Sequence, residues 1–531
     1  AAHDHRRFWR VRALRASMAE ATAPRFCVLG RNLAGLSTAY FLQRSFPRAH
    51  VVLVEQRSCP DSQIHSVRRS SGHVYEAGFY SSILVNKNGR ELLGLLRLLG
   101  LEDEVVSANI ENSARRHLYH HGRVQLFPRV PHILRFCPPL LAEPLWFRCS
   151  AQDESVHAFV ARRSSRDVAD RIADPLCRGM MGGDARQLSV RTCFPRLWFN
   201  ERRFRSVFVG SALSTLSAYR RRSWLSLDLL DPLLQRVSAG GRCYTLRRGL
   251  GSLVERIEER MLHPTTGARP AELLLDASAQ RIRASSQSAP WGPVDVLLDN
   301  GSVVRAEVVV AAVPPTVLAG LLEASVGELP MVGGIADGAD GLCGRLRSIP
   351  YRSAGVVNAR FDKDVMKGKF RGAGYFVGSL EQQAVLGMSW DSQLFPAASA
   401  ETQITAYVAE ESAGSTADAE SAALAALRSH LGLKAEPVDV HTAILETALP
   451  QYLVGHHQLL REFNAARLQS VPWLQVAGGG YYGTRGPADD VVDARQLADV
   501  VARRFGRFPG LVENEVDEDV AQRYGAGFDA D

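Results

Sequence analysis

Residues Arg25 to Glu55 read RFCVLGRNLAGLSTAYFLQRSFPRAHVVLVE, and this stretch decides the fold. The apolar run Phe26 to Leu29 predicts a strand, Leu33 to Gln43 predict an amphipathic helix, and Val51 to Val54 predict a second strand. A strand, a glycine turn, a helix and a strand in this order make one βαβ unit of the dinucleotide-binding kind. Glu55 follows the second strand, where an acidic residue accepts hydrogen bonds from an adenosine ribose.

The glycine turn of this unit departs from the dinucleotide pattern. That pattern is G-x-G-x-x-G, and here it reads Gly30-Arg31-Asn32-Leu33-Ala34-Gly35. Gly30 allows the tight turn and Gly35 lets the helix pack on the strand, but the missing middle glycine normally lets backbone approach a pyrophosphate. Asn32 puts a side chain there, although Asn tolerates the unusual backbone angles of such a turn. The unit is therefore either kept for packing alone or still binds a dinucleotide.

Length and composition indicate a folded protein of two or three domains. A chain of 531 residues exceeds one simple core, and 46% apolar, 22% charged and 8% aromatic residues are ordinary values. The formal charge of +7 comes from scattered arginines, so nucleic acid is a weak inference and an anionic membrane surface fits as well. No run of 18 apolar residues occurs, so we expect no transmembrane helix.

The cysteines indicate a reducing compartment. Eight of them lie far apart without any CxxC pair, at positions Cys27, Cys59, Cys137, Cys149, Cys177, Cys193, Cys243 and Cys343. We expect reduced thiols in the core, as in the cytosol or the mitochondrial matrix, and no disulfide framework or metal site.

Three segments suggest contacts outside the core. Residues 1–24 interleave arginines with apolar side chains, as in a mitochondrial targeting segment or a basic arm that docks on a partner. Residues 130–147, VPHILRFCPPLLAEPLWF, suit insertion into a bilayer interface or a partner groove, or else form an ordinary loop over the core. Residues 507–531 predict a loose acidic tail.

The remaining elements follow from periodicity. Val303 to Ala312 end in a buried strand that we expect to rejoin the first sheet, and Leu342 to Tyr407 predict the strands of a second sheet. Helices are expected near residues 88–99, 155–172, 202–217, 253–261 and 418–430, and another starts near Pro487.

With these segments in view, the chain resembles the protoporphyrinogen oxidase family, flavoenzymes of late haem synthesis, from Phe26 to Phe505. The most specific block is DPLCRGMMGGDARQLSVRTCFP, Asp174 to Pro195. Supporting blocks are VVVAAVPPTVLAGLL (Val308 to Leu322), VLGMSWDSQLFP (Val385 to Pro396) and LPQYLVGHHQLL (Leu449 to Leu460). The resemblance implies a flavin that oxidises a porphyrinogen with oxygen, in a dimer on the inner mitochondrial membrane.

The resemblance also implies a mixed α/β fold with a Rossmann-like FAD-type domain, a mixed-sheet substrate domain and a helical membrane-binding domain. We expect a basic arm at 1–24, the FAD-type domain at 25–87 with 240–325 and 470–506, the helical, membrane-facing domain at 88–200, the substrate domain at 201–239 with 326–469, and an acidic tail at 507–531.

The departures from the family lie around the flavin. Besides Asn32, they are Cys59-Pro60-Asp61-Ser62-Gln63 in place of an arginine-x-glycine-glycine element, Gly78-Phe79-Tyr80 in place of GPR, Arg247-Arg248-Gly249-Leu250 in place of RGGL, and Gly483-Thr484-Arg485-Gly486-Pro487 near the end. Each is expected to cost FAD binding about 1–3 kcal/mol, and together they suffice to abolish it.

The resemblance assigns the candidate site residues. Those of the degraded FAD site are Gly30, Asn32, Gly35, Glu55, Gly249, Gly478 and Gly483. On the substrate side, Arg178 would pair with a propionate or else form a structural ion pair, and the backbone of Gly179 would lie over the macrocycle. No catalytic residue and no metal ligand is assigned, since a flavin itself carries the redox step.

Three hypotheses follow. The first is an inactive family member without FAD, a structural or accessory subunit of a mitochondrial inner-membrane assembly, with other subunits and the membrane surface as partners and no nucleic acid. The second is an active, oxygen-dependent protoporphyrinogen IX oxidase that holds FAD through adapted contacts. The third is a porphyrin or haem carrier that keeps the substrate cavity without the flavin.

Overall fold

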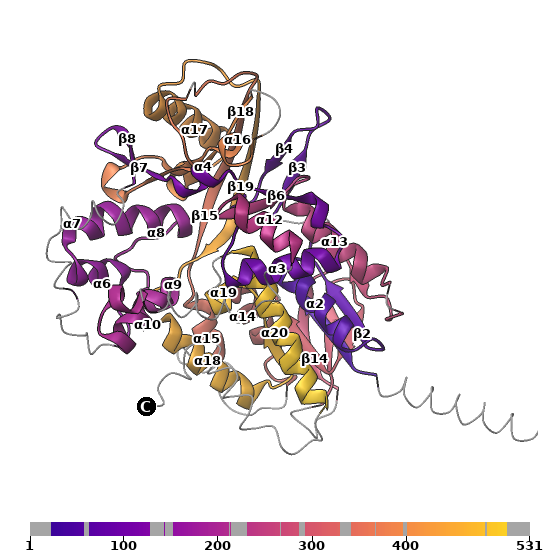
Figure 1. Ribbon diagram of the computed structural model, residues 1–531. Helices are drawn as coiled ribbons and strands as arrows, with labels where there is room; N and C mark the ends of the chain where they lie inside the picture. Colours follow the sequence, from indigo (N-terminus) through magenta and orange to yellow (C-terminus); the bar gives the residue numbers. More distant parts are fainter. Residues whose placement is uncertain are drawn as a thin grey trace, which may run out of the picture.

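The computed structural model describes residues 23–57, 63–127, 143, 152–211, 213, 231–265, 267–285, 292–329, 341–366, 368–396, 401–483 and 486–506 (Figure 1). The basic arm up to residue 22, the proline-rich segment apart from Glu143, and the acidic tail lie outside these residues. The predictions about those three segments therefore stay predictions.

A five-stranded parallel sheet forms the first domain. Its order is β10 (Glu272–Leu274), β2 (His50–Val54), β1 (Arg25–Leu29), β14 (Val308–Ala311) and β20 (Leu474–Val476). Numbered along the chain, this order is 3-2-1-4-5, which is that of doubly wound dinucleotide-binding folds. The expected return of the 303–312 segment to the first sheet is confirmed, because β14 pairs with β1.

Both faces of this sheet are covered, since successive strand side chains point to opposite faces. Phe26 and Val28 enter a core with α2 (Leu33–Ser45), α13 (Gly251–Leu262) and α20 (Pro487–Gly506). Cys27 and Leu29 enter a second core with the antiparallel strands β11 (Ala279–Ala284), β12 (Val294–Leu298) and β13 (Val303–Ala306) and with α14 (Pro315–Ala324), α15 (Leu342–Arg347) and α18 (His456–Ser470). The nucleotide-type unit is thus fully packed.

A seven-stranded sheet forms the second domain. Its order is β19 (Asp439–Pro450), β15 (Tyr351–Phe361), β18 (Thr402–Ala409), β17 (Val385–Ser389), β16 (Gly374–Val377), β7 (His117–His120) and β8 (Arg123–Leu126). All neighbours are antiparallel except β16 and β7. Helix α17 (Thr416–Leu431) packs on this sheet through Ala419, Ala423 and Leu427 (Figure 1).

Two expected domain assignments are wrong in part. The range 88–200 contains α3 (Lys87–Leu98), α6 (Val156–Arg163), α8 (Asp174–Met181), α9 (Val190–Cys193) and α10 (Pro195–Phe204), but it also contains β7 and β8 of the large sheet. The range 201–239 was expected beside that sheet, yet α12 (Pro232–Gly240) packs on the first core through Leu233 and Val237. Tertiary pairing decides both cases, and short strands carry too little periodicity to show it.

The smaller elements connect these domains. They are β3 (Ser66–Arg68), β4 (Val74–Glu76), β5 (Ile83–Leu84), β6 (Val105–Ser107), β9 (Cys243–Leu246), α4 (Ile110–Ala114), α7 (Arg166–Val168), a π-helix (Ala169–Ala173), α16 (Asp391–Leu394), α19 (Gly479–Tyr482) and the 3₁₀ turns η1 (Glu102–Glu104), η6 (Ser379–Glu381) and η7 (Glu410–Ser412).

Two predictions from composition concern the state of the cysteines and the presence of membrane-spanning helices. The five cysteines within the described part of the chain are buried free thiols, as expected. Across the same described residues, we find no helix with the length and apolar character needed to cross a membrane.

Candidate functional site

A cavity of about 480 Å³ opens at the carboxyl ends of the parallel strands. The turn from Gly30 to Ala34, Glu55 and Gly478 line it. Ligands of open α/β sheets bind outside the carboxyl ends of the strands. The cavity therefore lies where a dinucleotide would lie.

Packing requires glycine at two positions of the turn. Gly30 has φ +103°, and a Cβ there would lie 2.7 Å from the carbonyl oxygen of Ala312. A Cβ at Gly35 would lie 2.0 Å from the carbonyl oxygen of Gly30. Both glycines are thus needed for the fold whether or not a ligand is bound.

Asn32 caps helix α2. Its Oδ1 accepts a hydrogen bond from the Gly35 N–H at 2.9 Å, and its Nδ2 donates to the Ala312 carbonyl at 2.6 Å. Its backbone is extended, with φ −75° and ψ 174°. The expectation that Asn is tolerated there for unusual backbone angles is wrong, because the residue acts as an ordinary N-cap.

The charged groups of the turn are already paired. The carboxylate of Glu55 accepts the Arg31 N–H at 2.7 Å and the Arg57 N–H at 3.0 Å. The guanidinium of Arg31 pairs with Glu258 of α13, at 2.6 and 2.9 Å. The positive charge introduced into the turn is therefore directed to a neighbouring helix.

The described residues fit FAD only in part. The amides of Leu33 and Ala34 make no hydrogen bond to any described residue, both residues line the cavity, and a helix N-terminus attracts phosphate. Against this, the amide of Gly35 is occupied by Asn32, whose side chain takes the place of the middle glycine. The cradle thus offers the amides of Leu33 and Ala34 to a phosphate, while that of Gly35 is taken.

Of the three other expected FAD residues, one lines the cavity and two do not. Gly478, with φ +97°, lines it, but Gly249 and Gly483 are not among its lining residues. Gly249, with φ +87°, packs against Ser66. Beside it lies a residue that the sequence did not indicate, Glu76, which accepts the Ser66 hydroxyl at 2.6 Å and the Leu250 N–H at 2.7 Å. Burial raises the pKa of Glu76 to about 7.

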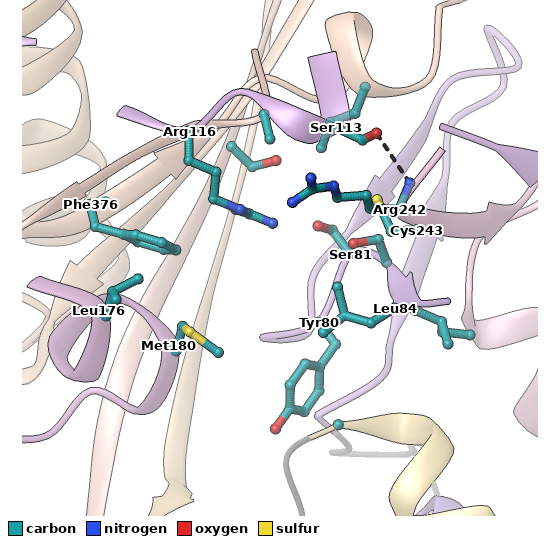
Figure 2. Close-up of a pocket in the computed structure, with 18 of the residues that line it drawn as sticks. Tyr80, Ser81, Leu84, Ser113, Arg116, Leu176, Met180, Arg242, Cys243 and Phe376 are labelled. Carbon is teal, nitrogen blue, oxygen red and sulfur yellow. Dashed lines mark hydrogen bonds between the residues drawn. The ribbon is translucent and has the colours of Figure 1, made fainter. Parts of the chain in front are cut away.

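A second, larger cavity of about 1070 Å³ lies between the two domains (Figure 2). Tyr80, from the segment that departs from the family's GPR element, lines both cavities. The larger cavity is cationic, because its described lining includes Asp489 as the only carboxylate against five basic side chains, Lys87, Arg115, Arg116, Arg196 and Arg242.

Arg116 gives this cavity an unpaired positive charge. The guanidinium lies 5.6 Å from the centre of the Phe376 ring and makes no hydrogen bond or ion pair to any described residue. In Figure 2 the side chains of Arg116 and Arg242 point toward each other across the cavity. Burial lowers the pKa of Arg116, and Arg242 adds to the effect. The Arg116 side chain is half-buried and faces the cavity, so its guanidinium, together with the other basic side chains of the lining, favours an anionic ligand.

Arg178 and Gly179, the two expected substrate-side residues, are separated by the structure. The Arg178 guanidinium donates to the carbonyls of Gly378 at 3.4 Å and Gln383 at 3.0 Å, and it does not line the larger cavity. Gly179 does line it, and a Cβ there would lie 2.1 Å from the Phe376 ring. The structure therefore places Arg116, and not Arg178, in the lining of the larger cavity.

A family comparison agrees with this architecture. The model of the flavin-containing amine oxidoreductases matches residues 33–484. Protoporphyrinogen oxidase of Macaca fascicularis is 30% identical over 497 residues, which cover 89% of this chain and 97% of that protein. The coproporphyrinogen III oxidase of Bacillus subtilis is 23% identical over 502 residues, covering 89% and 96%.

Solved structures share the fold. A protein from Exiguobacterium, assigned as a protoporphyrinogen oxidase, has a TM-score of 0.70 at 20% identity, covering 91% of this chain and 99% of that one. Cyclohexylamine oxidase from Brevibacterium oxydans has a TM-score of 0.61 at 16% identity, covering 91% and 100%. At these identities the likeness establishes the fold alone.

Proposed function

The chain belongs to the flavin-containing amine oxidoreductase family, among the relatives of protoporphyrinogen oxidase, and we propose that it binds a carboxylate-bearing tetrapyrrole without a tightly held flavin. It then acts as an accessory or carrier protein rather than an oxidase. The expected place of that role, a mitochondrial inner-membrane assembly with other subunits, is part of the proposal and rests on the arginine-rich start of the sequence.

The unpaired guanidinium of Arg116 carries the first half of the proposal. Relatives named for protoporphyrinogen and coproporphyrinogen act on macrocycles with propionate groups. A charge-assisted hydrogen bond from an arginine to such a carboxylate satisfies both groups. The cavity of about 1070 Å³ around Arg116 also offers apolar walls, including Phe376 and Met180, to the macrocycle.

The glycine turn supports the second half, the loss of tight flavin binding. The Asn32 side chain takes the amide of Gly35, and Arg31 is paired with Glu258 rather than with a phosphate. Both contacts give the polar groups of the turn partners within the protein itself. A diphosphate entering this cradle must displace the cap or bind beside it, which weakens binding.

An active oxidase is the second candidate, and one observation favours it. The amides of Leu33 and Ala34, together with Glu55, still face the smaller cavity, so an adenosine nucleotide retains a phosphate contact and a ribose contact. When bound, FAD would supply two-electron oxidation of the substrate. The chain's own part would be to hold the macrocycle by its carboxylates.

One experiment on purified protein distinguishes these candidates. FAD is counted by fluorescence after heat denaturation, and the same preparation is titrated with protoporphyrin IX and with its dimethyl ester, following the Soret band. We expect far less than one FAD per chain, and binding of the free acid about tenfold or more tighter than binding of the ester, because the ester removes the charge that Arg116 pairs with.

Each outcome is decisive. Near one FAD per chain, with oxidation of protoporphyrinogen, replaces the first candidate by the second. Equal affinity for acid and ester removes Arg116 from the proposal. Failure to bind either porphyrin, in folded protein without FAD, leaves the purely structural subunit of the first hypothesis.

A further inference from the structure

Two histidines and a glutamate meet at the tip of the β7–β8 hairpin. His120 ends β7, His121 follows it in the turn, and Glu381 ends η6 after strand β16. One possible ligand atom from each residue lies within 4.8 Å of the other two. Imidazole nitrogen and carboxylate oxygen are ligands of zinc and its neighbouring divalent ions.

The turn brings the two imidazoles to one side. Consecutive residues of a strand face opposite sides, but His121 has φ +48° and Gly122 has φ +72°, so the chain reverses at this point. The ring centroids of His120 and His121 then lie 3.9 Å apart, with 40° between the planes. Histidine adopts a positive φ more readily than most residues other than glycine, so the turn accommodates His121 beside His120.

Hydrogen bonding leaves His120 unsatisfied. Its Nδ1 lies 2.9 Å from Oε1 of Glu381, whereas its buried Nε2 has no partner among the described residues. If the proton is on Nδ1, the lone pair of Nε2 is unmet. If the proton is on Nε2, that N–H is unmet and two acceptors face each other at Nδ1 and Oε1. A cation between Nδ1 and the carboxylate separates the two facing acceptors, while the Nε2–H stays without a partner among the described residues.

Glu381 is fixed in position by its own segment. Its carboxylate accepts the His121 N–H with both oxygens, at 3.2 and 3.1 Å. The Gln383 side chain donates to the Glu381 carbonyl at 2.8 Å, and Arg178 donates to the Gln383 carbonyl. Asp174 accepts the N–H of Ser379 at 2.7 Å. Helix α8 thus holds the segment that carries the carboxylate, which gives Arg178 a role in supporting it.

We propose that His120, His121 and Glu381 bind a divalent ion of the zinc class, with water as the fourth ligand. Ligand atoms about 2.0–2.1 Å from a tetrahedral zinc ion are roughly 3.3 Å apart. The spread of up to 4.8 Å therefore has to close by a side-chain rotation. The exposed His121 has the freedom to make it.

The ion would fasten two neighbouring parts of the larger cavity's wall. Strand β7 begins directly after Arg116, and it pairs in parallel with β16, which carries Phe376 under the Arg116 guanidinium. Binding at the tip joins β7 to the segment that leaves β16. The ion therefore supports the wall that positions Arg116, and the inference stands even if the cavity takes another ligand.

The test is a zinc titration of the full chain, purified without a histidine tag and stripped with a chelator. Calorimetry should show one site, and His121→Ala and Glu381→Gln should each weaken it about tenfold or more. Zinc should also raise the melting temperature of the wild type and not that of the variants.

A matched control lies elsewhere on the surface. His73 lies 3.5 Å from Glu401, as a histidine–glutamate pair without a second histidine, so His73→Ala should leave the zinc site unchanged. Equal zinc affinity in the wild type and the double variant His121→Ala/Glu381→Gln overturns the proposal, as does an equal loss with His73→Ala. Co²⁺ gives a second measurement on the wild type alone: intense tetrahedral absorption bands support the site, and the weak bands of the hydrated ion contradict it.

Discussion

The two cavities of this protein differ in how their charges are satisfied. Around the smaller one, the Arg31 guanidinium is paired with Glu258, and the Glu55 carboxylate has two backbone amides. Around the larger one, the guanidinium of Arg116 has no partner among the described residues. A half-buried guanidinium that faces a cavity without an acidic partner is available to an anionic ligand, whereas a guanidinium already paired with a carboxylate is not. The comparison indicates that the larger cavity is kept for a ligand and that the smaller one is kept for the fold.

The largest effect is expected from Gly35→Ala, which tests whether the turn is structural. The new Cβ would lie 2.0 Å from the Gly30 carbonyl oxygen, and neither backbone can move far inside this core. We expect a loss of about 3 kcal/mol or more in the free energy of unfolding, measured by urea denaturation.

Gly94→Ala in helix α3 is the matched control, because a Cβ there meets nothing within 4 Å. It should leave stability unchanged or raise it by up to about 1 kcal/mol. Similar stabilities for the two variants would show that the turn is looser than its packing implies.

The next effect concerns the charges themselves. Arg116→Met should weaken protoporphyrin binding by about 1.5–3 kcal/mol, the value of a hydrogen bond to a charged group, while raising the stability of the free protein. Arg31→Met should instead lower the stability of the protein, because it leaves Glu258 without its partner, and it should leave the porphyrin affinity unchanged. Thermal melting and porphyrin titration of both variants measure this. Changes in melting temperature of opposite sign in the two variants support the comparison between the cavities, and changes of the same sign contradict it.

Local patterns were enough to predict the nucleotide-type unit. Strands β1 and β2 and helix α2 have strong periodicity and follow one another directly. The continuous apolar run Val308–Ala311 predicted a buried strand of the same sheet, and the structure buries it on both faces. Gly30 and Glu55 were found because a motif fixes their spacing from neighbouring elements, and Gly478 was assigned from the family resemblance. The structure places all three around one cavity.

The larger cavity was not predictable in the same way. Arg116 lines the cavity because β7 pairs with β16, a strand far along the chain. Nothing local in RRHLYHHGR indicates that partner. Arg178 was assigned from a family block instead, and its side chain turns to the carbonyls of Gly378 and Gln383. Sequence spacing gives an arginine's place on a helix, whereas the direction of its guanidinium depends on tertiary neighbours.

The smallest change in stability gives the sharpest test of the smaller cavity. Asn32→Gly restores the middle glycine and removes two hydrogen bonds, the cap on Gly35 and the bond to the Ala312 carbonyl. The cap change lowers stability by a few tenths of a kcal/mol and the loss of the second bond by about 1 kcal/mol. The freed amide and the vacated space should strengthen binding of ADP and FAD, measured by calorimetry. Asn32→Asp keeps the cap on Gly35, loses the hydrogen bond to the Ala312 carbonyl and adds a negative charge, so it should bind both nucleotides less tightly than the wild type. If Asn32→Gly binds neither ADP nor FAD more tightly than the wild type, the Asn32 side chain is not what weakens nucleotide binding. The contacts that already occupy Arg31 and Glu55 are then the reason for the weak binding.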